Sequence, residues 1–222
     1  ENLNAIVEAF APSEMGAKAL ANILSGKVNP SGKLPVSVAY NAGQIPIFYN
    51  HPMGSGSDQG ASIGFAEYAD CPHTPRYAFG HGCSYTTFAY DDLRLDKQVV
   101  SPDETITVSV DITNTGSFLG TEIVQLYLKD LHASMVRPCM ELQGFARVEL
   151  APEETKIVIF EIAPSQMAFL TTDMKWKIEK GQIKVMVGAA SDDIRLEDAF
   201  TISDHKYVRS PERKFYSLGE VQ

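Results

Sequence analysis

The chain contains several groups of residues whose chemistry is that of catalysts. Neighbouring carboxylates can divide general acid and general base roles between them, and such pairs occur at Asp91-Asp92, Glu153-Glu154 and Asp192-Asp193. All of these pairs fall in predicted turns or exposed ends of strands. We therefore interpret them as solvated surface charges and not as a catalytic pair.

The sequence shows no clear signal for nucleophilic catalysis or for metal binding either. The serines closest in sequence to His51 lie in a Gly/Ser-rich stretch over residues 53–64, and no Gly-x-Ser-x-Gly nucleophile elbow accompanies them. The five histidines are His51, His73, His81, His132 and His205. No two of them stand four residues apart, the spacing that zinc ligands on a helix often have. We predict no metal site and no cofactor.

The stretch Arg76–Phe88 separates two different sequence patterns. Helix and loop signals precede it, and strands with two-residue alternation follow it. Gly80 and Gly82 permit a positive φ or a close backbone approach, and the surrounding aromatic side chains can pack between two surfaces. We interpret the stretch as a packed corner between two structural units. The alternative is a corner that also lines a binding cleft.

The composition is that of an ordinary globular protein. The 222 residues are 44% hydrophobic and 21% charged, with a net charge of −9. So acidic a chain is a poor partner for nucleic acid, and no apolar run is long enough to span a bilayer. Three cysteines do not make a disulfide framework. Because a disulfide framework is not expected, the cysteines favour a reducing compartment, so we expect the cytoplasm; the periplasm or secretion stays open.

The first 50 residues show a strand followed by a helix. Asn4–Phe10 is short and apolar, which predicts a buried strand of the parallel type. A helix is expected from Ser13, as its N-cap, to Ser25, with Gly26 as its stop. One strand and one helix cannot bury both faces of a sheet, so the sequence predicts a partial α/β sandwich. A long linker loop follows over residues 51–87.

Residues 88–202 predict a β-sandwich. Strict alternation marks a strand at Ile106–Thr113, and further strands are expected at 124–128, 141–148, 157–162, 174–178 and 183–187. The last two strands are predicted to form a hairpin through Glu179–Gly181. About seven short strands over this length are typical of an antiparallel sandwich of immunoglobulin or fibronectin type III shape. The polar tail, residues 203–222, either wraps a neighbouring surface or frays.

A series of motifs then resembles one enzyme family. It consists of Asn29-Pro-Ser-Gly-Lys-Leu-Pro35, Pro46-Ile-Phe-Tyr-Asn50, Phe79-Gly-His-Gly-Cys-Ser-Tyr-Thr-Thr-Phe88 and Arg137-Pro-Cys-Met-Glu-Leu-Gln-Gly-Phe145. In this order the motifs resemble the C-terminal part of glycoside hydrolase family 3, which contains β-glucosidases and β-xylosidases. The departures, such as His81 and Cys83 in place of the usual Tyr or Phe and Leu, are core or surface exchanges.

The resemblance implies that the catalytic residues lie outside this chain. Retaining glycosidases use a carboxylate nucleophile and a carboxyl acid/base, and in this family both lie upstream of the region seen here. It therefore implies no catalytic residue on this chain, which alone should be inactive. Its partners would be the catalytic barrel, the rest of the α/β sandwich and a β-linked glucoside or xyloside. Close to the family's active-site mouth, Glu67, Tyr68 and Asp70 are the candidates for contact with substrate.

Two further interpretations stay open at the level of sequence. The chain could be an independent carbohydrate- or protein-binding module without enzymatic activity, although such a module would not need half of an α/β layer. It could also be one portion of a split or permuted enzyme that a second chain completes. The sequence does not specify the sugar, the linkage or the oligomeric state.

Overall fold

The computed structural model describes residues 3–52 and 71–222. Helices and strands occupy these ranges: α1 Gly16–Leu24, η1 Ala42–Gln44, β1 Phe88–Leu95, β2 Val99–Val100, β3 Ile106–Asn114, β4 Gly120–Asp130, β5 Glu141–Leu150, β6 Thr155–Ile162, η4 Pro164–Met167, β7 Phe169–Leu170, β8 Trp176–Ile178, β9 Gly181–Ala190, β10 Asp193–Ile202, β11 Lys206–Val208, η5 Ser210–Glu212 and β12 Ser217–Val221. None of the helices in these ranges has the length and apolar character needed to cross a membrane.

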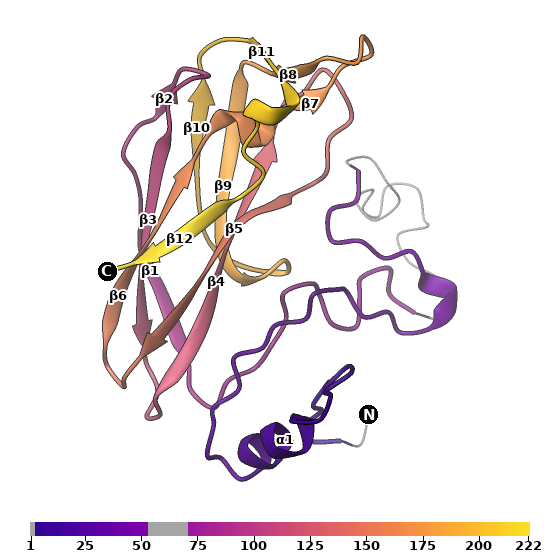
Figure 1. Cartoon of the computed structure of the whole chain (residues 1–222), viewed down its shortest axis with the longest axis vertical. Helices are drawn as coiled ribbons and strands as arrows, with labels where there is room; N and C mark the ends of the chain where they lie inside the picture. The colour runs from indigo at the N-terminus through magenta and orange to yellow at the C-terminus, as the bar shows by residue number, and fades with distance from the viewer. Residues whose placement is uncertain (1–2, 53–70) are drawn as a thin grey trace.

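The strands form a curled sheet that folds over into two layers (Figure 1). Its order is β1-β3-β6-β12-β5-β4-β9-β10-β2, and a small second sheet, β11-β8-β7, lies at one end. The predicted fibronectin type III-like sandwich is thus confirmed. The final strand joins the layers, because β12 pairs antiparallel with β6 and parallel with β5. The tail therefore wraps the sandwich and does not fray.

The core lies between the two layers. In β3 the apolar side chains Ile106, Val108, Val110 and Ile112 are fully buried, and they alternate with half-buried polar residues. This is the pattern expected of a strand with one face on the core. In contrast, β4 is buried on both faces over most of its length. Its second face is covered by the linker segments that precede the sandwich.

The N-terminal segment is the first place where the structure differs from the expectation. Residues Asn4–Phe10 form no strand and are mostly exposed. A parallel strand needs neighbouring strands to satisfy its backbone groups, and the described part of the chain pairs none with this segment. The strand prediction is therefore wrong for the chain as it stands.

The helix forms, with a different beginning. It starts at Gly16, and its N-cap is Met15, which makes no side-chain cap hydrogen bond; the predicted N-cap Ser13 instead lies one turn earlier with a positive φ of 52°. The C-terminal stop is confirmed, because Gly26 has a φ of 73°. Its N–H donates to the carbonyl of Ile23 at 2.9 Å.

The predicted hairpin of residues 174–187 is wrong. β8 pairs with β7 and β11 in the small sheet, whereas β9 lies between β4 and β10. Both edges of β9 are thus occupied by longer strands, and no edge is left for β8. The turn signal at Glu179–Gly181 is real, but it moves the chain from one sheet to the other.

Candidate functional site at the linker–sandwich junction

From here on we use the term linker for all described residues between α1 and the sandwich that pack on it, 29–52 and 71–87. This linker covers β4 through a cluster of aromatic rings. The ring of Tyr49 stacks on that of Phe79, with centroids 4.2 Å apart, and meets the ring of Tyr127 edge-on at 6.0 Å. Tyr127 is fully buried. Two linker segments that are distant in sequence are therefore packed together on the same strand, as the interpretation of Arg76–Phe88 as a packed corner requires.

A buried glutamine joins this cluster to the backbone. The Gln125 side chain is 3% exposed, and its amide Nε2 donates to the carbonyls of Gly80 at 3.2 Å and Ala189 at 2.5 Å. Its Oε1 accepts from the Tyr127 hydroxyl at 2.5 Å. Because a buried amide without partners would be costly, these bonds fix the position of the linker on the sheet.

Glycine is required at this contact. Gly80 has a φ of 80°, and a Cβ there would lie 2.1 Å from Oε1 of Gln125. Gly82 has no positive φ, but its Cβ would lie 2.3 Å from the carbonyl oxygen of Gly32. The expectation that these glycines serve a positive φ or a close approach is confirmed, with both reasons acting at Gly80.

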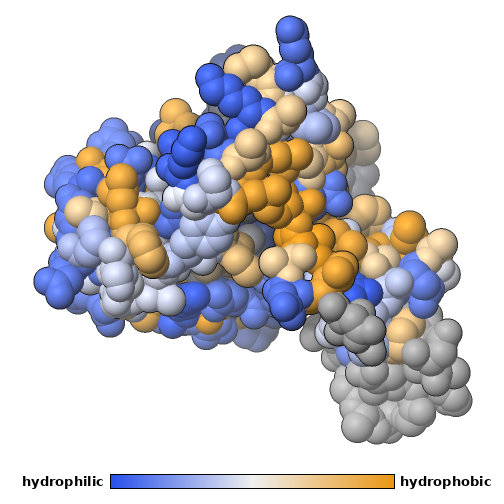
Figure 2. All heavy atoms as spheres, turned by 90° about the horizontal axis from the view of Figure 1, so that it is seen from below, coloured by the Kyte–Doolittle hydropathy of each residue, from blue (hydrophilic) through white to orange (hydrophobic). Residues whose placement is uncertain are grey.

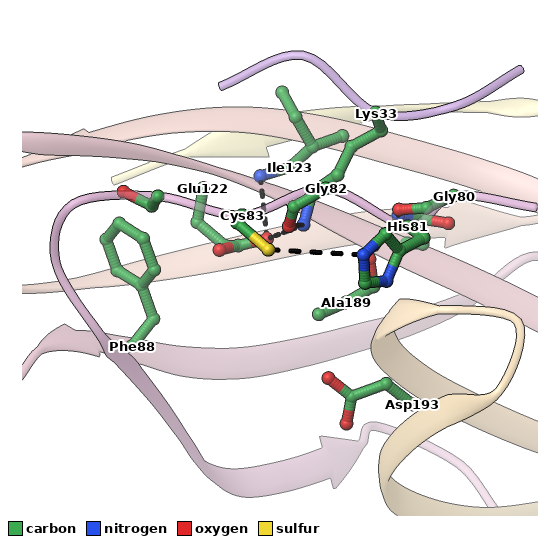
Figure 3. A network of polar contacts seen from close by, with 12 residues as sticks. Lys33, Gly80, His81, Gly82, Cys83, Phe88, Glu122, Ile123, Ala189 and Asp193 are labelled. Carbon is green, nitrogen blue, oxygen red and sulfur yellow. Dashed lines mark hydrogen bonds and ion pairs between the residues drawn. The ribbon is translucent and has the colours of Figure 1, made fainter. Parts of the chain in front are cut away.

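A buried ion pair connects a second linker segment with β4 (Figure 3). The ammonium of Lys33 lies 3.0 Å from Oε1 of Glu122, and the two side chains are only 13% and 7% exposed. Lys33 also donates to the carbonyl of Gly82 at 3.3 Å, and Glu122 accepts from the N–H of Ile123 at 3.1 Å. The carboxylate is thereby compensated by one cation and one backbone donor.

The first residue of the linker motif, Asn29, acts as a clamp. Its Oδ1 accepts from the hydroxyl of Ser84 at 2.9 Å and from the N–H of Tyr85 at 2.8 Å, and its Nδ2 donates to the carbonyl of Leu119 at 3.0 Å. One side chain thus ties the segment before the sandwich to the turn before β4.

Titratable groups surround the ion pair. Asp193, predicted as a solvated charge, keeps a half-exposed side chain but pairs with Arg195 through bonds of 3.1 and 2.9 Å. Hydrogen bonding from Arg195 lowers the pKa of Asp193. Arg195 donates to the carbonyl of Phe88 at 2.7 Å. Burial, and then the charge of Glu122, raise the pKa of Tyr90.

The family-departing residues also meet here. His81 Nε2 lies 4.0 Å from the sulfur of Cys83, and its ring stacks on Tyr77 with centroids 5.4 Å apart. The charges of the junction are thus engaged in holding segments together. This arrangement suits a structural role.

The candidates for substrate contact, Glu67, Tyr68 and Asp70, lie outside the described residues. The chain is anchored on both sides of them. The N–H of Cys139 donates to the carbonyl of His51 at 2.9 Å. On the other side, the Gln44 amide donates to the carbonyls of Pro72 and Thr74, each at 2.8 Å. The role of the candidates stays a prediction.

The sequence reasoning missed the polar residues that build the junction. Lys33 was considered only as part of the motif Asn29–Pro35, Gln125 only as a member of the predicted strand 124–128, and Glu122 was not singled out. One signal was available: Gln125 interrupts the apolar run of β4, which is the pattern of a polar group with a specific buried partner. The partner, the carbonyl of Gly80, is 45 residues away in sequence and could not be predicted from the local pattern.

Residues 3–28, which we call the arm, carry an apolar face of a different kind. A groove of about 310 Å³ runs along α1, lined by Val7, Pro12, Met15, Leu20 and Ile23 among others. Leu3, Ile6 and Phe10 are 76%, 58% and 61% exposed. Viewed from the side of α1, Figure 2 shows apolar side chains gathered in a band across this face. We call this surface the arm face.

Fold and junction together define a fibronectin type III-like sandwich that is preceded by a helical segment. Comparison with known proteins gives the same pair of domains: residues 1–85 match the glycosyl hydrolase family 3 C-terminal domain, and residues 122–191 match a fibronectin type III-like domain. The chain belongs to glycoside hydrolase family 3.

Individual relatives agree with this assignment. Thermostable beta-glucosidase B of Acetivibrio thermocellus is 37% identical over 94% of this chain, and a beta-xylosidase of Formosa agariphila is 39% identical over 88%. A beta-glucosidase structure from Listeria innocua, in complex with glucose, superimposes with a TM-score of 0.81 at 33% identity over 91% of this chain. The chain spans about a quarter of the length of these relatives, 27–28%.

Proposed function

We propose that this chain is the non-catalytic C-terminal portion of a retaining β-glycosidase that removes terminal β-linked glucose or xylose. It orders the α/β sandwich domain and flanks the active-site cleft. Relatives named as β-glucosidases and β-xylosidases support this proposal. So does the family match over residues 1–85.

One observation carries the proposal. The sandwich has a closed apolar core, whereas the arm face exposes large apolar side chains and a groove. Exposed apolar patches of this kind mark interaction surfaces. The rest of the α/β sandwich, with the catalytic barrel attached, is the occupant that the family match suggests. Glu67, Tyr68 and Asp70 belong to this proposal as residues near bound substrate.

Native purification followed by intact-mass analysis tests the proposal. We expect a longer polypeptide, or a barrel-bearing companion chain, that hydrolyses 4-nitrophenyl β-D-glucoside or β-D-xyloside, while the pure 222-residue chain does not. A lone, monodisperse chain of 24.3 kDa would argue against it. So would turnover by the pure chain at an enzymatic rate, on the order of 1 per second or more.

The alternative function is an independent binding module, and the closed core of the sandwich favours it. The two functions differ at the arm face. Leu20→Asp should abolish assembly and activity of a glycosidase, and it should leave a free module unaffected. For the compartment we propose the cytoplasm, because the cysteines Cys71, Cys83 and Cys139 form no disulfide with one another. Cell fractionation tests this, and recovery in the periplasm, the location in the name of one relative, a periplasmic beta-glucosidase, would overturn it.

A further inference from the structure

A thiol and an imidazole lie side by side at the linker–sandwich junction (Figure 3). Nε2 of His81 is 4.0 Å from Sγ of Cys83, a long hydrogen-bonding distance for sulfur. Both residues depart from the family pattern, so the pair is a feature of this chain. The bonds described above that hold the linker on β4 use neither side chain.

The pair lies on a fixed piece of backbone. The carbonyl of His81 accepts from the N–H of Leu34 at 2.8 Å, and its ring stacks on Tyr77. Gly82 lies between the two residues, and a Cβ there would be 2.3 Å from the carbonyl oxygen of Gly32. A nucleophile and a base that are held in this way are preorganised for proton transfer.

Charged side chains from the linker, β4 and β10 surround the pair. They form two ion pairs, Lys33 with Glu122 and Asp193 with Arg195. Hydrogen bonding from Arg195 is the main cause that lowers the pKa of Asp193, and the charge of His81 contributes to the same shift. Asp193 is therefore within electrostatic reach of His81. A carboxylate in this position stabilises the imidazolium that forms when the ring takes a proton.

Exposure distinguishes Cys83 from the other two cysteines. Cys83 is exposed, whereas Cys71 and Cys139 are partly buried. The thiol of Cys139 donates to the carbonyl of Tyr49 at 3.3 Å, and Sγ of Cys71 accepts from the amide of Asn41 at 3.7 Å. The reactivity of a thiol depends on exposure and on neighbours that favour the thiolate. A reagent in solution should therefore react first with Cys83.

We propose that Cys83 is a modification site, at which a small disulfide such as oxidised glutathione forms a mixed disulfide with the protein and His81 acts as the base. The thiol gives its proton to Nε2 of His81, and its sulfur attacks one sulfur of the reagent. A bond forms between Sγ of Cys83 and that sulfur while the S–S bond of the reagent breaks. The departing thiolate then takes up the proton from the imidazolium. Cys83 is thereby oxidised to the disulfide level, and half of the reagent is reduced to a thiol.

The unmodified chain tests the choice of cysteine. The 222-residue chain is incubated with oxidised glutathione at pH 7, and modification of each cysteine is followed by peptide mass spectrometry. We expect Cys83 to react at least about tenfold faster than Cys71 or Cys139, and the three to agree within about threefold in concentrated urea. Equal rates in the folded chain, or a faster reaction at another cysteine, would overturn the proposal.

The variant His81→Phe tests the base. Phenylalanine keeps a ring that can stack on Tyr77, and it removes Nε2. At pH 7 the rate at Cys83 should fall by about tenfold, less than the roughly 10²–10⁴-fold that well-placed enzymatic bases supply, because 4.0 Å is long for proton transfer. At about pH 9.5, above the roughly 8.5 of an ordinary thiol, the two chains should agree within about threefold, since a thiol then ionises without help.

His132→Phe is the matched control. His132 is an exposed histidine just after β4, at the opposite end of that strand from Glu122, and its replacement should leave the rate at Cys83 unchanged. An unchanged rate in His81→Phe at pH 7 would overturn the proposal. So would an equal loss at both pH values, because it would show reduced access of the reagent and not the loss of a base.

The comparison of the three cysteines needs no variant, so it decides the matter even if His81→Phe does not fold. Neither measurement involves a glycosidase or its substrate. Failure of the activity assay therefore leaves a selective reaction at Cys83 intact, and failure of the thiol experiment leaves the assembly and activity results intact.

Discussion

Replacing Lys33 by methionine tests whether buried charge holds the linker on the sandwich. The variant keeps the aliphatic stem and removes the ammonium 3.0 Å from Glu122. At that distance and an effective dielectric constant of about 20, the attraction is about 5.5 kcal/mol, and desolvation of the two charges offsets several kcal/mol of it. Lys33→Met loses the attraction and leaves the carboxylate of Glu122 desolvated.

The free-energy cost of an unpaired Glu122 is limited, because the linker can detach from β4 and let water reach the carboxylate. We therefore expect Lys33→Met to reduce the free energy of linker docking. Docking should weaken by about 3 kcal/mol, at the low end of the roughly 3–5 kcal/mol found when one member of a buried pair is removed. The free energy of unfolding of the sandwich should fall by less than about 1 kcal/mol, since local opening precedes global unfolding.

Hydrogen exchange measures docking directly. The N–H of Leu34 donates to the carbonyl of His81 at 2.8 Å, and the N–H of Gly80 donates to the carbonyl of Leu34 at 2.8 Å. Protection of these two amides should fall by about two orders of magnitude, while the amide of Val108 in the core should keep its protection.

The control and the rescue sharpen this experiment. Lys156→Met removes a cation 3.3 Å from Glu154, in a pair whose side chains are 33% and 38% exposed, and it should leave linker protection unchanged. The double variant Lys33→Met/Glu122→Leu should recover most of the loss, because no buried charge is left unpaired. Linker protection within about threefold of the unmodified chain in Lys33→Met would refute the reasoning.

Two further predictions concern the same junction. Gly80→Ala should weaken linker docking by about 2–3 kcal/mol, measured as lost protection of the Leu34 amide, because of its φ of 80° and the collision with Gln125. Gly26→Ala, with a φ of 73° and no atom within 4 Å, is strained only at the end of α1 and should leave that protection unchanged, and equal effects would contradict the argument. Arg195 lowers the pKa of Asp193 in the folded state, so its stabilisation is present above the unfolded value of about 4 and is lost as the pH falls through the folded value. The stability difference between the chain and Asp193→Asn, below about 1 kcal/mol for so exposed a pair, should therefore shrink between pH 7 and pH 2 in urea titrations, and a constant difference would count against it.

Much of the sandwich could be predicted because its strands bury one face only. The expected strand Ile106–Thr113 is β3 to within one residue, and those at 141–148 and 157–162 lie inside β5 and β6. Two-residue alternation is a local signal, and it survives whenever the other face meets water. β4 was recognised only in part, as residues 124–128, because the linker buries its second face and removes the alternation.

Pairing was harder to predict than the strands themselves. Nothing local distinguishes a turn that closes a hairpin from one that carries the chain between sheets, and so β8 was assigned to the wrong partner. The tail sequence did not predict β12, because this strand has no buried apolar face to produce an alternating pattern. Leu218 and its partner in register, Phe145, are both largely exposed. β12 forms because the edges of β5 and β6 lie open beside it, which is a property of the folded sandwich.

The contrast between the linker and the arm carries the functional argument furthest. The linker is held on the sandwich by polar side chains with specific partners, such as Asn29 and Lys33. The arm exposes large apolar side chains instead, among them Leu3, Ile6 and Phe10. Polar buried contacts fix register, whereas apolar contacts supply most of the free energy of association. As a hypothesis for this chain, the junction sets the arm's orientation in advance, so that covering the arm face also positions the chain on either side of Glu67, Tyr68 and Asp70. Lys33→Met should then reduce the activity of an assembled glycosidase more than it reduces assembly, and equal losses in both would sink this hypothesis.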